Sequence, residues 1–533
     1  MDKKRLGVMV DCSRNAVMKV ETVKKFIDAM SKMGYNMLML YTEDTYEVDN
    51  QPWFGYLRGR YTKDEMKEIV KYGEEKGIEL IPCIQTLAHL NQMFRWSEYC
   101  YSIRDCDDIL LIDEEKTYKL IEDMFSTLRE CYTTKKLHIG MDEAHNVGLG
   151  RFLDKHGFQN RFEIIARHLK RVADLAKKYD FEPMMWSDMF FRLANHGGYY
   201  VKDPEIITEE IVKCVPDNVE LVYWDYYQKQ REPYNIMIEA HKRFRKPVWF
   251  AGGAWTWTGF TPHNNLSMII TNSAMSACRD GGVENVFLTC WGDNGGECST
   301  FAVLPSLFYS AEIYRGNEDM ASIKQRFEDL FGIAFDDYMK LDLPSVFGPG
   351  AETSAQLPDK QLLYSDPFLG YGDTIIVDVK SIKETYLGYA KELWPLANHE
   401  TYGHLFKSAA ALCEAVAYKG GLGKLTREVY KSGDKEAMEE IVKEYLIAGA
   451  KVNAFHRAFE ECWMAEKKPH GFDVQDARLG GLIKRLESCR ERLEGYIRGD
   501  IDRIPELEEE LLDFPTREYR NNNYSKCVSV NAF

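Results

Sequence analysis

The sequence predicts a (β/α)8 barrel followed by an all-α domain. From residue 6 to about 315, short apolar runs rich in strand-forming residues alternate with amphipathic helical stretches, which is typical of repeated βα units around a parallel sheet. We count eight such units, and eight strands each followed by a helix favour a closed barrel over an open sheet. No Gly-x-Gly-x-x-Gly segment follows the first run, which argues against a dinucleotide-binding fold. Helical patterns dominate beyond about residue 320, so we expect a barrel over 1–320 and a helical domain over 321–533.

The individual elements follow from local patterns. The expected strands begin, in chain order, near Leu6, Asn36, Glu79, Leu137, Pro183, Val219, Pro247 and Glu284. Between them, the segment 62–65 reads Thr-Lys-Asp-Glu, a capping box that predicts a helix start. Gly34 and Gly77 are predicted to end the first two helices. In the C-terminal region, the patterns over 405–417 and 439–463 predict long helices.

Composition excludes several classes of function. The net charge of −16 and the pI near 5.4 repel phosphate backbones, so we expect no nucleic-acid partner. The thirteen cysteines are scattered singly and indicate reduced thiols rather than a disulfide scaffold. No apolar run is long enough to span a membrane and no signal-peptide pattern is present, so we expect a cytoplasmic protein. The twelve histidines form no HExxH or HxxEH motif, and we expect neither a metal nor another cofactor.

Active sites of such barrels lie at the C-terminal ends of the strands. The residues that end the apolar runs are Arg14, Glu43, Asp44, His89, Asp142, Glu143, Trp186, Asp188, Trp224, Asp225, Tyr226, Trp255, Trp257, Trp291 and Asp293. They include five of the ten tryptophans, together with carboxylates and an arginine. Aromatic rings pack on the apolar faces of sugars while charged groups bind their hydroxyls, so this set predicts a sugar site. The alternative is that the tryptophans fill the barrel core.

The strongest local signal is the segment 138–144, which reads His-Ile-Gly-Met-Asp-Glu-Ala. Two adjacent carboxylates at a strand end repel each other. This should raise the pKa of at least one of them, as a general acid requires. The alternative is a helix-capping Asp142 followed by a solvated Glu143.

This segment resembles the His/Asn-x-Gly-x-Asp-Glu-apolar motif on the fourth strand of the family 20 glycoside hydrolases. The resemblance extends over residues 5–315. The segment 11–14 resembles the first-strand segment whose arginine holds sugar hydroxyls, and 82–89 resembles the third-strand segment that ends in the family's histidine. Further tryptophans match the lining of the family's terminal-sugar subsite, and these are Trp186, Trp224 and the triplet Trp291-Gly292-Asp293.

The sequence departs from the family pattern in two places. The seventh strand usually carries a tyrosine for the substrate acetamide, followed two residues later by an aspartate, whereas here Trp255 and Trp257 occupy that stretch. Tyr226 after the sixth strand is the candidate substitute. Most relatives also place a smaller α/β domain before the barrel, and with the first strand at residue 6 we expect that domain to be absent.

The resemblance implies an exo-acting, retaining β-N-acetylhexosaminidase in which the nucleophile is the substrate's own acetamido oxygen. Glu143 would be the general acid and base, and Asp142 would orient the acetamide. His89, with Glu43 or Asp44 behind it, would hold Glu143 in position. The residues expected to bind the terminal GlcNAc or GalNAc are Arg14, Trp186, Trp224, Asp225, Trp257, Trp291 and Asp293.

Two rival interpretations remain open at this point. Another barrel glycosidase that uses the substrate acetamide would carry an Asp-Asp pair or a DxxDxDxE motif instead of the adjacent Asp142 and Glu143. A catalytically inactive glycan-binding protein would keep the tryptophans and Arg14 and dispense with the acid. The preference between GlcNAc and GalNAc and the natural glycan are left open, and the helical domain is a candidate homodimer interface.

Overall fold

The computed structural model describes residues 4–348, 350–513 and 523–531. Eight parallel strands close into a barrel in sequence order, with β1 hydrogen-bonded to β8. The strands are β1 (Arg5–Asp11), β2 (Met37–Tyr41), β3 (Glu79–Cys83), β4 (Lys136–His138), β5 (Glu182–Trp186), β6 (Glu220–Trp224), β7 (Trp249–Gly253) and β8 (Asn285–Cys290). Each strand overlaps the run that predicted it, with β1, β4 and β5 beginning one residue earlier, so the barrel prediction is confirmed.

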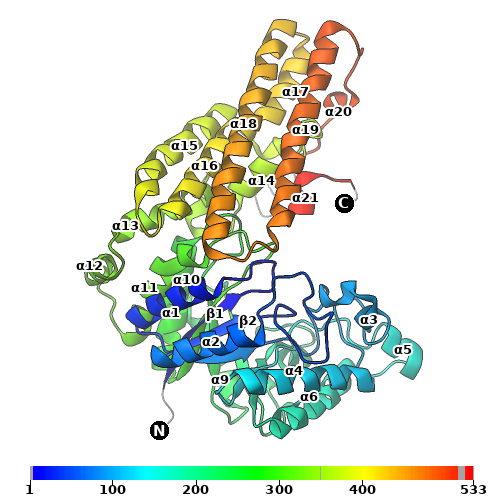
Figure 1. The fold of residues 1–533 in the computed structure, drawn as a ribbon, viewed down its shortest axis with the longest axis vertical. Coiled ribbons are helices and arrows are strands. Elements are labelled where there is room, and N and C mark those ends of the chain that lie inside the picture. The colour runs from blue at the N-terminus through cyan, green and yellow to red at the C-terminus, as the bar shows by residue number, and fades with distance from the viewer. Residues whose placement is uncertain (1–3, 349, 514–522, 532–533) are drawn as a thin grey trace. The chain divides into compact units, whose positions relative to one another are not determined.

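Helices separate successive strands and lie outside the barrel (Figure 1). The principal ones are α1 (Val20–Lys32), α2 (Lys63–Glu75), α4 (Glu115–Cys131), α6 (Arg161–Lys178), α7 (Asp188–Ala194), α9 (Arg231–Lys242), α10 (Asn264–Asp280) and α11 (Leu304–Arg315). The capping box at the start of α2 is present, with the Thr62 side chain accepting from the Glu65 N–H. Beyond the ends of α1 and α2, Gly34 and Gly77 adopt the positive φ that glycine tolerates best.

The barrel interior is filled by large, flexible and aromatic side chains. Fully buried methionines at positions 9, 37, 39 and 184 pack with the rings of Tyr41, Trp186 and Trp249. Met adapts its shape to irregular gaps, which suits an interior crowded by rings. Trp224 and Trp291 pack against this cluster but stay partly exposed. The apolar core therefore continues into an open wall of tryptophans at the C-terminal end of the strands.

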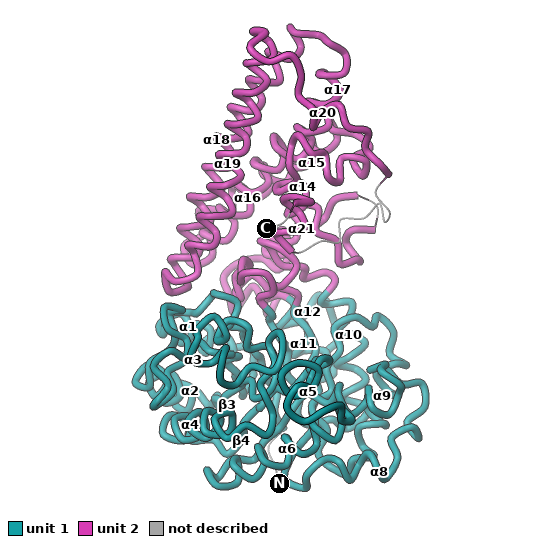
Figure 2. Tube along the Cα trace, turned by 90° about the vertical axis from the view of Figure 1, so that its right-hand side faces the viewer, with its two compact units in different colours: residues 1–254, 267–291, 306–323 teal, residues 255–266, 292–305, 324–533 magenta. Residues whose placement is uncertain are grey.

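The chain divides into two compact units (Figure 2). Unit 1 comprises residues 1–254, 267–291 and 306–323, and it holds the barrel strands. Unit 2 comprises residues 255–266, 292–305 and 324–533. The segments that follow β7 and β8 thus belong to unit 2, in contrast to the single boundary at residue 320 expected from the sequence.

Unit 2 is helical. Its main helices are α12 (Met320–Phe331), which begins in unit 1, then α14 (Pro358–Tyr364), α15 (Val379–Leu393), α16 (Gly403–Lys419), α17 (Leu422–Ser432), α18 (Lys435–Glu466) and α19 (Phe472–Arg498). The helices predicted over 405–417 and 439–463 are confirmed as α16 and α18. Figures 1 and 2 show α18 and α19 side by side, and α16 packs against α15 and α18. Buried alanines at positions 409, 410, 411, 415 and 417 let the α16 backbone approach its neighbours closely.

All thirteen cysteines are free thiols, as the sequence predicted. Within the described residues, no helix combines the length and the apolar character that crossing a membrane requires.

Candidate active site

A strained turn at the end of β4 presents the two adjacent carboxylates. Gly140, Met141 and Glu143 all have positive φ, at 71°, 70° and 51°. Gly140 is required because a Cβ there would lie 2.0 Å from Oε1 of Gln85. For Met141 and Glu143 the left-handed conformation costs on the order of 1 kcal/mol each, and such strain gathers where surrounding contacts impose it. This turn leaves the side chain of Asp142 13% exposed and that of Glu143 46% exposed.

Gln85 fixes the position of Asp142. Its Nε2 donates to Oδ1 of Asp142 at 2.7 Å and lies 3.0 Å from the Tyr41 hydroxyl. Its Oε1 accepts the N–H of Met141 at 3.1 Å. Sequence analysis did not select Gln85, although it ends the β3 run within the segment 82–89. The glutamine joins the ends of β2 and β3 to the turn after β4.

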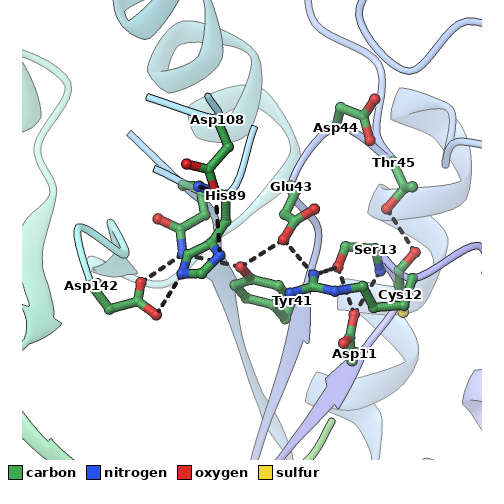
Figure 3. Close-up of polar contacts among 12 residues, drawn as sticks. Asp11, Cys12, Ser13, Tyr41, Glu43, Asp44, Thr45, His89, Asp108 and Asp142 are labelled. Atoms are coloured by element: carbon green, nitrogen blue, oxygen red, sulfur yellow. Dashed lines mark hydrogen bonds and ion pairs between the residues drawn. The ribbon is translucent and has the colours of Figure 1, made fainter. Parts of the chain in front are cut away.

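His89 is the second partner of Asp142 (Figure 3). Its Nε2 lies 3.2 Å from Oδ2 of Asp142 and 3.9 Å from Oε2 of Glu143. Burial by itself lowers the pKa of His89, but the Asp142 carboxylate and, farther away, Glu43 outweigh it and raise the pKa to about 10. His89 is therefore an imidazolium at neutral pH. It contacts Asp142 more closely than Glu143, and its expected role as the support of Glu143 stays a prediction.

The carboxylate behind His89 is Asp108. Its Oδ2 accepts the backbone N–H of His89 at 3.1 Å and lies 3.8 Å from Nδ1 of that ring. Of the two residues expected there, Asp44 instead forms an ion pair with Arg58 at 2.9 Å. The charge of the other, Glu43, raises the pKa of His89. Asp108 lies in the long connection between β3 and β4. Its place in an acid-rich stretch, 105–108, was the one available signal.

Glu43 also forms an ion pair with Arg14. The Glu43 carboxylate is buried, accepts from the Tyr41 hydroxyl at 3.0 Å and forms a short ion pair with the Arg14 guanidinium. Burial raises the pKa of Glu43, and Arg14 opposes this rise. Arg14 also donates to Oγ of Ser13 at 2.6 Å. These contacts fix a cation beside Tyr41 and Glu43 (Figure 3).

Asp188 lies behind Glu143. Its Oδ2 accepts the Glu143 N–H at 3.2 Å, and its side chain is fully buried. Burial, reinforced by the negative charge of Asp142, raises the pKa of Asp188 to about 7. For Asp142 burial acts in the same direction, but His89 and Gln85 outweigh it and lower the pKa. The predicted rise in a carboxyl pKa therefore does not occur at Asp142; it occurs at Asp188.

Two predicted tryptophans, Trp186 and Trp291, come together as an aromatic wall. The ring of Trp186 lies 4.4 Å from that of His138 and 6.2 Å from that of Trp291, centroid to centroid. Tyr41 meets Trp291 edge-on at 4.8 Å. His138 is fully buried, and burial lowers its pKa to about 3, so it is a neutral part of this wall.

Tyr226 joins the same wall. Its ring stacks with that of Trp224 at 5.5 Å. Burial raises the pKa of its hydroxyl well above the usual value. Hydrogen bonds with the side chains of Trp291 and Thr289 act in the opposite direction but are weaker than the effect of burial. These bonds place the Tyr226 hydroxyl among the pocket residues of β8.

The remaining candidates are placed differently. Asp225 is fully buried and accepts from the Tyr223 hydroxyl at 2.9 Å and from the Tyr227 N–H at 3.0 Å, so its carboxylate supports its own loop. Its contact with a sugar stays a prediction. Trp257 and Asp293 belong to unit 2, where Trp257 stacks on Trp255 at 4.5 Å. Their part in the pocket also stays a prediction.

One group among the described residues has the composition and spacing to hold a metal ion, and it lies in unit 2. It consists of His404, Cys462 and Glu466. The Glu466 carboxylate already lies 2.8 Å from Nε2 of His404 and accepts from the Ser299 hydroxyl at 2.7 and 2.8 Å. These partners account for its burial without an ion.

Comparison with known proteins follows the same division. The protein-family model described as glycosyl hydrolase family 20, catalytic domain, matches residues 5–234. The model described as Glycoside Hydrolase 20C C-terminal domain matches residues 336–526. Together they match most of the chain.

Three similar proteins illustrate the relationship. Beta-hexosaminidase 3 of Arabidopsis thaliana is 23% identical over 242 residues, covering 41% of this chain and 45% of that protein. Hexosaminidase D of Homo sapiens is 25% identical over 224 residues, covering 40% of this chain and 43% of that protein. The structure of a Flavobacterium johnsoniae chitobiase covers 99% of this chain and 77% of that chain, with 16% identity and a TM-score of 0.45. The matches span less than half the length of the two curated relatives. Because one family model covers the Asp142-Glu143 turn and a second covers the helical region, the chain belongs to glycosyl hydrolase family 20.

Proposed function

We propose that this protein is an exo-acting, retaining β-N-acetylhexosaminidase that releases terminal β-linked GlcNAc or GalNAc through an oxazolinium intermediate. Family membership supports the reaction class, and the printed names of the relatives are those of hexosaminidases. The observation that carries the proposal is that the two adjacent carboxylates differ in their fixed partners and in their exposure. Asp142 is held ionised between Gln85 and His89, whereas the Glu143 side chain is nearly half exposed to solvent.

This inequality supports a division of roles. A carboxylate oxygen has two lone pairs, so Asp142 can accept a substrate N–H while keeping its bonds to Gln85 and His89. Its negative charge would orient the acetamide and stabilise the cationic intermediate. Glu143, which carries no such pair of fixed partners, is placed to exchange protons with the leaving group and with water.

The chemical steps balance without an enzyme nucleophile. In the first step, Glu143 gives its proton to the glycosidic oxygen as the bond from that oxygen to the anomeric carbon breaks. The acetamido carbonyl oxygen bonds to the anomeric carbon from the opposite face, which yields the oxazolinium. In the second step, water attacks the anomeric carbon and gives a proton to Glu143. The bond from the acetamido oxygen to the anomeric carbon breaks, so the oxazolinium ring opens and the anomeric configuration is retained overall.

The pocket supports an exo mode and an N-acetyl preference. Arg14, fixed by Glu43, would bind hydroxyls of a terminal sugar. Trp186, Trp224 and Trp291 would enclose the acetyl methyl group. The position of Tyr226 beside Trp291 supports it as the substitute for the family's seventh-strand tyrosine.

Successive fluorination of the substrate acetyl group tests the mechanism. Fluorine withdraws electrons from the acetamido oxygen while barely changing its size, so log kcat should fall steeply from acetyl to trifluoroacetyl. Glucosides without the amide should be essentially inert. A flat response, or a glycosyl ester trapped on Asp142 or Glu143, would contradict the proposal and indicate a two-carboxylate mechanism.

Two simpler measurements address the rival interpretation and the assembly. An inactive glycan-binding protein would not turn over a chromogenic β-GlcNAc substrate, whereas we expect turnover. Parallel assays with β-GalNAc would give the sugar preference. The homodimer through the helical region stays a prediction, to be checked by light scattering of the full chain.

A further inference from the structure

Three aromatic side chains, two of them exposed and one partly buried, gather on two connections of the barrel. Trp53 and Tyr56 lie in the connection after β2, and Trp96 lies in the connection after β3, just before α3 (Ser97–Cys100). The ring centroids of Trp53 and Trp96 are 5.1 Å apart, and Tyr56 lies 5.3 Å from Trp53 and 5.4 Å from Trp96. Trp53 and Tyr56 are 41% and 42% exposed. We call these three residues the aromatic platform.

The platform belongs to the same connections as the candidate active site. The connection after β2 also carries Glu43, and the connection after β3 also carries His89, seven residues before Trp96. Both connections leave the C-terminal ends of their strands, which is the face on which barrel enzymes bind substrate. The platform therefore lies on the substrate face of unit 1.

The connection after β2 is held against residues that adjoin Arg14 and Glu43. A Cβ on Gly55, between Trp53 and Tyr56, would lie 1.9 Å from the backbone oxygen of Asp44, so this backbone touches the residue next to Glu43. Arg58 pairs with the Asp44 carboxylate at 2.9 Å and donates to Asn15 at 3.1 Å. It also donates to the backbone oxygen of Ser13, beside Arg14.

The second connection is tied to the first. The Tyr99 hydroxyl of α3 donates to Oε1 of Gln51 at 3.2 Å. Gln51 in turn donates to Asp123 of α4 at 2.9 Å. The two connections that carry the rings are thus joined to each other before any ligand arrives, which lowers the entropic cost of binding.

We propose that the aromatic platform binds the part of the glycan that follows the terminal sugar. This inference rests on the proposed function. Trp53 and Trp96 are tilted by 34°, whereas Tyr56 stands at 84° to Trp53, so the cluster has two differently facing ring surfaces. Exposed rings of this kind suit the apolar C–H faces of pyranoses.

The test compares substrates of increasing length. For the full-length protein, kcat/KM on β-1,4-linked GlcNAc di-, tri- and tetrasaccharides should rise with length by about tenfold, a typical effect of one well-placed aromatic contact. Methyl β-GlcNAc, which reaches only the terminal-sugar pocket, provides the baseline. Trp53→Ala and Tyr56→Ala should each flatten the length dependence while leaving kcat/KM on methyl β-GlcNAc unchanged. Trp53→Phe should retain part of it.

Two matched variants act as controls. Tyr101→Ala removes a 79% exposed ring from the same connection as Trp96, and Trp394→Ala removes a 38% exposed tryptophan from unit 2. Both should keep the wild-type length dependence. A length-independent wild type, or an unchanged dependence in Trp53→Ala, would overturn the platform even if methyl β-GlcNAc is hydrolysed. If no β-GlcNAc substrate is hydrolysed, the proposed function fails instead. Quenching of tryptophan fluorescence by the tetrasaccharide, lost in Trp53→Ala, then decides the platform separately.

Discussion

The Nε2 atom of His89 lies 3.2 Å from Oδ2 of Asp142, and this contact sets the charge of both side chains. It keeps His89 protonated and Asp142 ionised at neutral pH. The positive charge of His89 keeps Asp142 an ionised carboxylate. Asp142 is therefore suited to orienting the acetamide and not to donating a proton. The electrostatics of the site therefore depend on this pair more than on repulsion between Asp142 and Glu143.

The first prediction concerns the pH dependence of this pair. The pKa of His89 is raised from its usual 6.5 to about 10, so the folded state retains the proton more strongly than the unfolded state. Its stabilising contribution is full below pH 6.5 and is lost as pH rises through about 10. The difference in Tm between the wild type and His89→Gln should therefore shrink from pH 6 to pH 10. A difference that is constant with pH would show that the imidazolium is not paired with Asp142.

The second prediction concerns the general acid. Glu143→Gln keeps the size of the side chain and removes its proton, so kcat/KM should fall by roughly 10²-fold or more on a poor leaving group. A leaving group that needs no protonation should be affected much less. Steady-state assays with aryl β-GlcNAc substrates of graded leaving-group pKa measure this. Equal losses across the series would assign the proton transfer to another residue.

The third prediction concerns Asp188. Its pKa is raised to about 7 from an ordinary value of 3.8, so the fold loses stability as pH rises from about 4 to 7 and this buried group ionises. Asp188→Asn can still accept the Glu143 N–H and has no charge to bury. The variant should gain Tm relative to the wild type between pH 5 and pH 8. Asp180→Asn, with a side chain 71% exposed, is the control and should show no such change.

The fourth prediction concerns the aromatic wall. Trp291→Ala removes a ring that meets both Tyr41 and Trp186. Binding of a GlcNAc-derived thiazoline, which mimics the oxazolinium, should weaken by about 2 kcal/mol, or roughly 30-fold. Inhibition constants measured beside circular dichroism of the variant separate this loss from misfolding. Unchanged affinity would place Trp291 outside the subsite.

Local patterns in the chain were sufficient to predict the barrel and the residues at its rim. Strand runs, capping signals and glycine stops are local patterns, so β1 to β8 and the ends of α1 and α2 could be located without knowledge of their neighbours. Residues at or just after the end of a strand lie at the C-terminal end of the barrel, where active sites are found. The candidates Arg14, Asp142, Glu143 and Trp186 could be selected for this reason. The Asp142-Glu143 motif is likewise contiguous in the chain.

Which of these residues contact one another could be seen only in the folded chain. Asp108 joins Glu43 in acting on His89, and Asp188 rather than Asp142 has the raised pKa, because both outcomes depend on which connections meet in space and what they bury. The platform of Trp53, Tyr56 and Trp96 joins residues that are 43 positions apart at most, on connections without a periodic pattern. Such contacts are set by loop packing, for which the sequence offers no repeating signal.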